Sequence, residues 1–257
     1  MQHNYDFSIL VPGIRPGNWT HLYESIKSST SRSFEMIIIS PYDLPRNLEG
    51  NLQIKLIKSF SGPLRAQQLG LIQSTGKYVS WAADDGWYLP NALDVSFNHL
   101  ESTPNSVVVG KYNEGPDNKE MDDINYYYFA RHDGSSGKYV PQDCLMLMCG
   151  VIPRELLFEI GGWDCQFEVC PMGYIDVSIR LYNRGCKFIF QNEMMFRCGH
   201  MPGTVGDHAP IHYAQTQHDS PLFKLIYSRE NSKQRINIPL DNYKKYSDRW
   251  GKRFGAV

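Results

Sequence analysis

Two adjacent carboxylates, Asp84 and Asp85, stand in the segment SWAADDGWYLP at residues 80–90. They follow a hydrophobic run that is typical of a buried strand, and a glycine comes directly after them. Neighbouring carboxylates repel each other unless a cation or hydrogen-bond donors lie between them. A divalent cation, Mg²⁺ or Mn²⁺, is one solution, and such an ion also bridges to substrate phosphates. The alternative is an Asp-Asp-Gly turn with both carboxylates solvated.

The segments before and after these carboxylates alternate between short apolar runs and amphipathic stretches. The apolar runs predict strands at residues 7–11, 34–39, 52–58, 77–83 and 106–110. Apolar spacing and boundary residues predict helices at residues 19–26, 64–75 and 90–100. Because strand and helix alternate and the strands are continuously apolar, we expect an α/β fold with a mostly parallel sheet covered by helices.

Three loops of this fold are expected to meet at one edge, because ligands bind outside the carboxyl ends of parallel strands. The residues placed there are Pro12, Gly13, Ile14, Arg15, Ser40, Asp43, Asp84 and Asp85. The guanidinium of Arg15 is suited to a phosphate. Neither G-x-x-x-x-G-K-[ST] nor G-x-G-x-x-G follows the first strand, which excludes a P-loop and a dinucleotide-binding fingerprint.

The second half of the chain is less regular. Further strands are predicted at residues 124–130, 144–150 and 187–191, and further helices at 153–161 and 174–185. The polar segment 114–123 is expected to be a loop or a hairpin tip. The last 60 residues are rich in His, Asp, Tyr and Lys. The spacing of three histidines at residues 208–218 predicts either a lid over the ligand or a metal cluster.

The composition limits the classes of function. The chain has 257 residues and a net charge of −1, so we expect no nucleic-acid partner. No apolar run approaches the roughly 18 residues that span a bilayer, and the N-terminus does not resemble a signal peptide. The six cysteines lack C-x-x-C spacing, which predicts reduced thiols in a cytoplasmic protein; disulfides are the alternative. Contact with a membrane surface is left open.

Several of these segments occur together in a recognisable order. FSILVPGIRP, FEMIIIS, GLIQSTGKYVSWAADDGWYLPNAL and IGGWD…YIDVSIRLYNRGCKF follow one another over roughly residues 6–195. The chain thereby resembles the family 2 glycosyltransferases with the GT-A (Rossmann-like) fold. The resemblance implies a nucleotide-sugar-binding half at 1–110, an acceptor-binding half with a smaller mixed sheet at 111–199, and a C-terminal extension at 200–257.

The resemblance also implies an activity. Members of this family move a sugar from a nucleoside diphosphate sugar to a carbohydrate or glycoconjugate acceptor, mostly with inversion, and use Mn²⁺ or Mg²⁺. Residues 12–15 would contact the nucleotide, and Gly13 replaces the common threonine. Ser40 replaces the aspartate that usually pairs with uracil, while Asp43 lies three residues further on. A uridine donor remains the expectation, with thymidine or another base as alternatives.

The resemblance assigns the remaining donor-side residues. Arg65 and Gln68 belong to the helix that packs against the nucleotide in this family. Asp85 would ligate the metal, and Asp84 would bind the ribose or support the metal through water. Ala82 stands where the family often has a first aspartate. His200, after the last strand, stands where some GT-A enzymes have a metal-ligating histidine.

An inverting transfer needs a carboxylate that takes the proton from the acceptor hydroxyl. The family's Glu-Asp pair at this place is replaced by Gly173 and Tyr174. Asp176 is therefore the expected general base, with Arg180 orienting it, and Glu168 or Asp164 are the reserves. A purely structural pair of Asp176 with Arg180 is the alternative.

Aromatic side chains near these carboxylates suit the faces of sugars. Trp87, Trp163 and Asp164 are the candidate acceptor residues, and core packing is the alternative for both tryptophans. Two other functions stay open: a nucleotidyltransferase, and a catalytically degenerate protein that binds carbohydrate or nucleotide.

Overall fold

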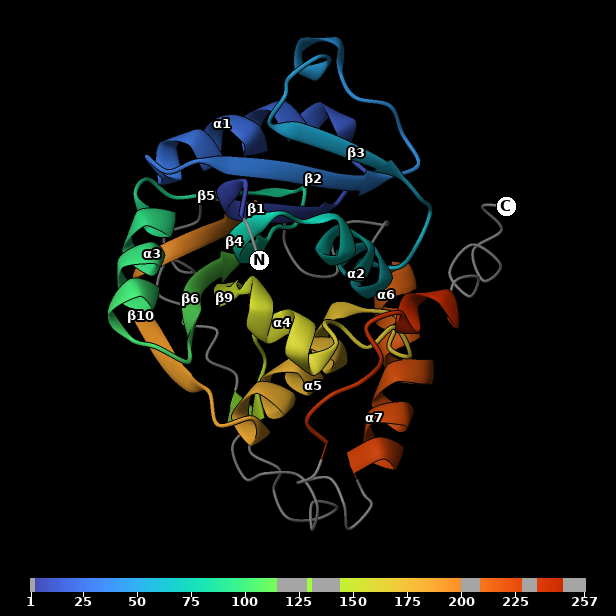
Figure 1. The fold of residues 1–257 in the computed structure, drawn as a ribbon. Helices are drawn as coiled ribbons and strands as arrows, with labels where there is room; N and C mark the ends of the chain where they lie inside the picture. Colours follow the sequence, from blue (N-terminus) through green and yellow to red (C-terminus); the bar gives the residue numbers. More distant parts are fainter. Residues whose placement is uncertain (1–2, 115–128, 131–143, 200–208, 228–234, 247–257) are drawn as a thin grey trace.

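The computed structural model describes residues 3–114, 129–130, 144–199, 209–227 and 235–246. Its centre is an eight-stranded sheet (Figure 1). In order across the sheet, the strands are β3 (Ile54–Lys58), β2 (Phe34–Ser40), β1 (Tyr5–Pro12), β4 (Gly76–Trp81), β9 (Gly150–Pro153), β6 (Ser106–Glu114), β10 (Lys187–Cys198) and β5 (Gly86–Tyr88). Strands β9 and β5 are antiparallel to their neighbours and the other pairs are parallel, which confirms the predicted, mostly parallel sheet.

Helices cover both faces of this sheet. One face carries α1 (Trp19–Ser29) and α3 (Ala92–Ser102), and the other carries α2 (Pro63–Gln73), α4 (Arg154–Ile160) and α5 (Cys170–Asn183). Side chains of β1 alternate between the two cores: Leu10 packs with α2, whereas Ile9 and Val11 pack with α1. A strand buried on both faces has no polar side, which explains the continuous apolar runs.

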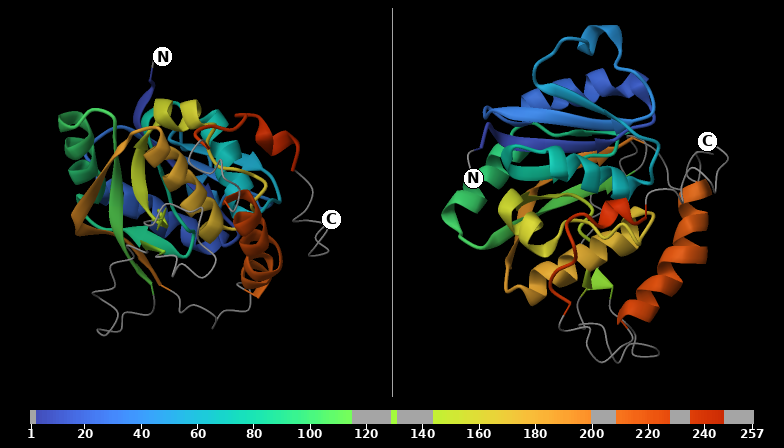
Figure 2. Two further views of the ribbon diagram at one scale, coloured as in Figure 1. Left: turned by 90° about the horizontal axis from the view of Figure 1, so that it is seen from below. Right: turned by 45° about the vertical axis from the view of Figure 1, so that its right-hand side comes forward.

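The C-terminal part adds a helical rod beside this domain. It consists of α6 (Ala209–Ala214), the π-helical turn η5 (Gln215–Asp219) and α7 (Ser220–Tyr227), which follow one another without a break (Figure 2). Short 3₁₀ turns lie at η1 (Pro16–Asn18), η2 (Arg46–Leu48) and η7 (Asn242–Lys244). Strands β7 (Phe129–Ala130) and β8 (Cys144–Leu145) form a separate antiparallel pair.

The sequence predictions differ from the structure at several places, and the strand predicted at 187–191 continues as β10 to Cys198. The strand predicted at 144–150 is two strands of different sheets: β8 ends at Leu145, the backbone turns where the N–H of Met148 donates to the carbonyl of Met146, and β9 begins at Gly150. Strand β5 was missed, since its three residues are held by pairing with β10 rather than by any local pattern. The helical rod at 209–227 was not predicted either. Residues 115–128, which include most of one predicted strand, lie outside the described residues.

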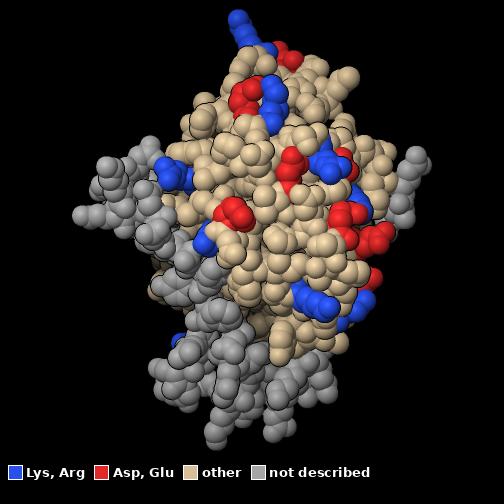
Figure 3. All heavy atoms as spheres, turned by 90° about the vertical axis from the view of Figure 1, so that its left-hand side faces the viewer, with Lys and Arg blue, Asp and Glu red and all other residues tan. Residues whose placement is uncertain are grey.

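Two surface properties follow from the described residues. Among them, no helix is both long and apolar enough to cross a bilayer. On the face drawn in Figure 3, Lys and Arg side chains are interspersed with Asp and Glu. In its described part, that face therefore offers no continuous basic surface to a nucleic-acid backbone.

Strands β1 and β4 approach each other so closely at Gly76 that a side chain at this position should destabilise the protein. A Cβ atom at Gly76 would lie 2.5 Å from the backbone carbon of Phe7 and the backbone nitrogen of Ser8, whereas one at Gly17 would meet nothing within 4 Å. We expect Gly76→Ala to lower the free energy of unfolding by about 1–3 kcal/mol, as overpacking does. Gly17→Ala should change it by less than about 0.5 kcal/mol. Urea unfolding measures both, and equal stability of the two variants would contradict the packing.

Candidate functional site

The carboxyl ends of β1, β2, β3 and β4 lie at one edge of the sheet, because these strands are parallel. We call this edge the ligand edge. Strand β9 is antiparallel to both β4 and β6, so β6 and its parallel partner β10 end at the same edge. The arrowheads of β2 and β3 mark this edge in Figure 1, on the side where α6 lies. The loops after these strands contain most of the predicted site residues.

Asp84, in the loop after β4, fixes the loop after β1 by hydrogen bonds. Its side chain is only 2% exposed, and its Oδ2 atom accepts hydrogen bonds from the backbone N–H groups of Ile14 (2.7 Å) and Arg15 (2.6 Å) and from Nε1 of Trp19 (3.2 Å). Its Oδ1 atom accepts from Nη1 of Arg15 at 2.5 Å. Asn18 donates to the backbone carbonyl of Asp84. These donors satisfy the buried carboxylate, which thereby holds the loop after β1 in place.

Asp85 lies beside Asp84 and is more exposed. Its Oδ2 atom lies 3.4 Å from Nη1 of Arg15, and its Oδ1 atom accepts from the Cys198 thiol at 3.3 Å. The guanidinium of Arg15 thus contacts both adjacent carboxylates and offsets their repulsion. The structure therefore brings together Arg15, Asp84 and Asp85, which the sequence analysis placed at one edge.

The rest of the first loop shows why this chain has a glycine after Pro12. The backbone N–H of Gly13 donates to the carbonyl of Ile39. A Cβ atom at Gly13 would lie 2.9 Å from Nε1 of Trp19, so the indole occupies the space that a side chain would need. Ile14 is 46% exposed beside it and is available to a ligand.

The two candidates after β2 have different surroundings. Ser40 is fully buried, and its Oγ atom accepts from the backbone N–H of Tyr42. Asp43 is largely exposed and pairs with Lys58 at 2.6 Å. Both lie at the ligand edge, but only Asp43 presents its side chain to solvent. Their contact with a nucleobase stays a prediction.

The two candidates on α2 also differ. Arg65 donates to the carbonyl of Tyr243 and to Oγ of Ser59, so it joins the C-terminal segment to the loop after β3. Gln68 is buried. Its amide nitrogen donates to the carbonyls of Gly161 and Leu240, and its amide oxygen accepts from the backbone N–H of Trp163. Gln68 therefore holds the turn at Gly161 and Gly162, called the Gly-Gly turn below, and does not reach a ligand in this arrangement.

Asp176 lies in the interior rather than at the ligand edge. It is fully buried, and its two oxygens accept from Nε of Arg180 (2.8 Å), the hydroxyl of Tyr227 (2.6 Å) and Nε of Arg235 (2.9 Å). Burial alone would raise the pKa of Asp176, but the charges of Arg180 and Arg235 outweigh it and lower the pKa. A general base must reach the acceptor hydroxyl. This geometry does not fit that role, and it matches the structural alternative.

The candidate acceptor residues are mostly buried as well. Trp163 is fully buried and packs edge-to-face on Trp81, with ring centroids 5.5 Å apart, so its ring has no face open to a sugar. Asp164 is 1% exposed and is bonded by Arg235 and Gln166. Trp87 is half-buried and contacts the ring of His21 edge-on. Of the three, only Trp87 has surface that an acceptor can reach.

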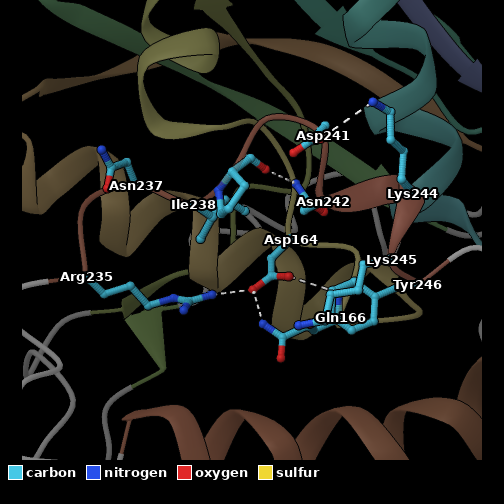
Figure 4. Close-up of a pocket in the computed structure, with 11 residues that line it drawn as sticks. Asp164, Gln166, Arg235, Asn237, Ile238, Asp241, Asn242, Lys244, Lys245 and Tyr246 are labelled. Carbon is cyan, nitrogen blue, oxygen red and sulfur yellow. Dashed lines mark hydrogen bonds and ion pairs between the residues drawn. The ribbon is translucent and has the colours of Figure 1, made fainter.

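A polar pocket of about 650 Å³ lies where the C-terminal segment crosses Asp164 (Figure 4). Its lining includes Arg235, Lys244, Lys245 and Tyr246. These residues carry no signal in the sequence, because the pairing of Arg235 with Asp164 and Asp176 joins positions 59 to 71 residues apart. No local pattern shows such a pair.

A metal ion at the ligand edge would depend on Asp85. Among the described residues, no group of three His, Cys, Asp or Glu side chains is arranged to hold a metal ion. His200, the second expected ligand, lies outside them. The donors present fit an ion that takes most of its ligands from a diphosphate and water, since Mg²⁺ binds through one or two carboxylates in such sites.

The Asp176 cluster predicts a pH-dependent loss of stability. Asp176→Asn leaves Arg180 and Arg235 without their charge partner, so we expect the free energy of unfolding to fall by about 3–5 kcal/mol at neutral pH. The folded-state pKa of Asp176 is lowered, so the stability that it contributes is present above its ordinary pKa of about 3.9 and is lost as the pH falls through the folded value. Urea unfolding at several pH values measures this.

The matched control is Asp241→Asn, whose carboxylate is largely exposed and lies 3.6 Å from Lys244. It should change stability by less than about 0.5 kcal/mol at any pH. A wild-type stability for Asp176→Asn at pH 7 would show that the cluster is not what holds α5, α7 and the C-terminal segment together.

Comparison with known proteins gives two kinds of similarity. No protein-family model matches the chain. A curated protein of Rickettsia bellii (strain RML369-C), named an uncharacterized glycosyltransferase, is 27% identical over 164 residues. The alignment covers 59% of this chain and 23% of the curated protein, so the chain spans about a quarter of its relative's length.

The solved structures show the fold. The structure of S. aureus TarS 1-349 matches with a TM-score of 0.58 at 11% identity, covering 99% of this chain and 92% of that one. A longer TarS chain matches with a TM-score of 0.55 at 12% identity, covering 79% and 37%. The chain therefore shares the TarS fold, and part of its sequence is similar to a protein named a glycosyltransferase.

Proposed function

We propose that the protein is a glycosyltransferase that moves a sugar from a nucleoside diphosphate sugar to a hydroxyl of a carbohydrate or glycoconjugate acceptor. The observation that carries this proposal is the arrangement of Arg15, Asp84 and Asp85 at the carboxyl edge of the sheet. The partial sequence similarity to a protein named a glycosyltransferase points in the same direction. The order of motifs favours family 2 of the GT-A enzymes.

The chain's own residues suggest how the donor would lie. The loop at residues 13–15 is fixed by Asp84, so its exposed side is preorganised for a nucleotide. Arg15 supplies positive charge beside the diphosphate position, and Asp43 is the solvent-facing carboxylate nearest the end of β2 for a base such as uracil. Asp85, with His200, would hold Mn²⁺ or Mg²⁺, which when bound neutralises charge that develops on the leaving diphosphate.

The transfer itself is proposed as a single displacement with inversion. The acceptor oxygen forms a bond to the anomeric carbon, and the bond from that carbon to the diphosphate oxygen breaks. The electron pair leaves with the nucleoside diphosphate, and the proton of the hydroxyl passes to a base. Trp87 is the aromatic residue suited to the sugar at this edge.

Asp85 gives the most direct test of donor binding. With UDP and Mn²⁺ at about 100 times the Kd, ligand binding should stabilise the wild-type protein by about 2.7 kcal/mol and raise its Tm. Asp85→Asn should abolish the Mn²⁺-dependent part of this shift while its Tm without ligand stays close to that of the wild type. Thermal-shift assays with UDP, TDP and GDP, each with and without Mn²⁺, measure the effect.

Glu24→Gln serves as the control, because its exposed carboxylate lies on α1 and pairs with Lys27 of the same helix. It should keep the full Mn²⁺-dependent shift. If Asp85→Asn shows the full wild-type shift with Mn²⁺, the metal assignment is wrong. If pyrophosphate rather than nucleoside diphosphate is released from nucleotide substrates, the nucleotidyltransferase alternative replaces the proposal.

A further inference from the structure

We propose that His218, held in place by Asp219, accepts the proton of the acceptor hydroxyl. This inference rests on the proposed glycosyltransferase function and names a general base for it. The sequence pattern assigned no such role to His218, which lies in the π-helical turn η5. Single π-helical turns are rare and occur frequently at functional sites.

Asp219 is a fixed hydrogen-bond acceptor for the ring. It is fully buried, and its carboxylate accepts from the backbone N–H groups of Glu168 (3.0 Å) and Val169 (2.8 Å). The same carboxylate lies 2.7 Å from Nδ1 of His218. Because an ionised carboxylate only accepts hydrogen bonds, Nδ1 must carry the proton, and Nε2 is then the nitrogen with the lone pair.

The surroundings of the ring also favour the imidazolium that forms when His218 accepts a proton. Glu168, in the loop before α5, places Oε1 3.8 Å from Nδ1 of His218. Two carboxylates therefore lie near Nδ1 of the ring and stabilise the imidazolium that forms when Nε2 accepts a proton. The His218 side chain is 22% exposed, in contrast to the fully buried Asp176, so a substrate can reach it.

The cluster of Glu168, His218 and Asp219 lies at the start of α5, because Asp219 accepts from the N–H groups of the two residues that precede this helix. The start of α5 in turn packs on the end of β4, since the ring centroids of Tyr174 and Trp81 lie 5.8 Å apart. The loop after Trp81 carries Asp84 and Asp85. The rod that carries η5 lies on the side to which β2 and β3 point (Figure 1).

The other candidates at this place are less suitable. Asp176 and Asp164 are buried and bonded to arginines. Tyr174 is buried, its hydroxyl accepts from Gln67 at 2.7 Å, and burial raises its pKa well above the ordinary value. Tyrosine in this state does not remove a proton at neutral pH. In the part of the chain that the structure describes, His218 is the better-placed proton acceptor.

The variant His218→Asn tests the role, because its amide N–H can replace the bond from Nδ1 to Asp219 but provides no basic nitrogen. We expect kcat, measured as UDP release from UDP-sugars with Mn²⁺, to fall about 10²–10⁴-fold. The Kd for UDP with Mn²⁺, measured by calorimetry, should be unchanged. His212→Asn, an exposed histidine on α6 of the same rod, is the matched control and should keep the wild-type kcat.

The pH profile separates a base from a structural residue. Wild-type kcat should fall at low pH as the imidazole becomes protonated, and this acid limb should disappear in His218→Asn. Asp219 of its own turn and Glu168 face the ring, at 2.7 Å and 3.8 Å from Nδ1. Burial raises the pKa of Asp219, so the loss of the acid limb in His218→Asn, rather than its position on the pH axis, identifies the histidine.

A measurement on the wild-type protein covers the case in which His218→Asn does not fold. The ¹⁵N shifts of the His218 ring at pH 8 should show a protonated Nδ1 and an unprotonated Nε2. The opposite tautomer, or wild-type kcat in a folded His218→Asn, overturns the inference. Absence of binding by any nucleoside diphosphate to the wild type instead overturns the proposed function, so the two failures are distinguishable.

Discussion

The carboxylate of Asp84, just after β4, is buried and loses its hydration by water. Hydrogen-bond donors of the protein must replace that hydration. The donors are the backbone of Ile14 and Arg15, the indole of Trp19 and the guanidinium of Arg15. This one requirement fixes the loop after β1, and through Trp19 it also fixes the start of α1. It further explains Gly13, since the indole that donates to Asp84 leaves no room for a side chain there.

A second buried charge, on Asp176, organises the other half of the molecule. Arg180 donates to it from one turn further along α5 and also donates to the carbonyls of Ile160 and Gly162. Arg235 and Tyr227 reach it from the C-terminal part. The cluster therefore holds α5, the Gly-Gly turn and α7 together. Both oxygens of this buried carboxylate accept hydrogen bonds within the cluster, which fits a structural role.

The sequence predicted what depends on local patterns. The strands β1, β2, β4 and β6 and the helices α1 to α5 follow from hydrophobic periodicity, and the convergence of Arg15, Asp84 and Asp85 follows from the parallel topology. The packing of Trp163 on Trp81 matches the core-packing alternative for this residue. Burial of Gln68 could not be predicted, because its amide bonds to the carbonyls of Gly161 and of Leu240 in the C-terminal segment. The cluster of His218, Asp219 and Glu168 likewise joins residues about fifty positions apart, which no spacing in the sequence reveals.

A crystal structure of the protein with UDP and Mn²⁺ would show where the diphosphate lies. We expect the diphosphate beside the loop at residues 13–15, with the metal ion bound between its oxygens and the carboxylate of Asp85. Binding of UDP at the pocket lined by Arg235, Lys244 and Lys245, with Asp85 not in contact with metal or nucleotide, would contradict it.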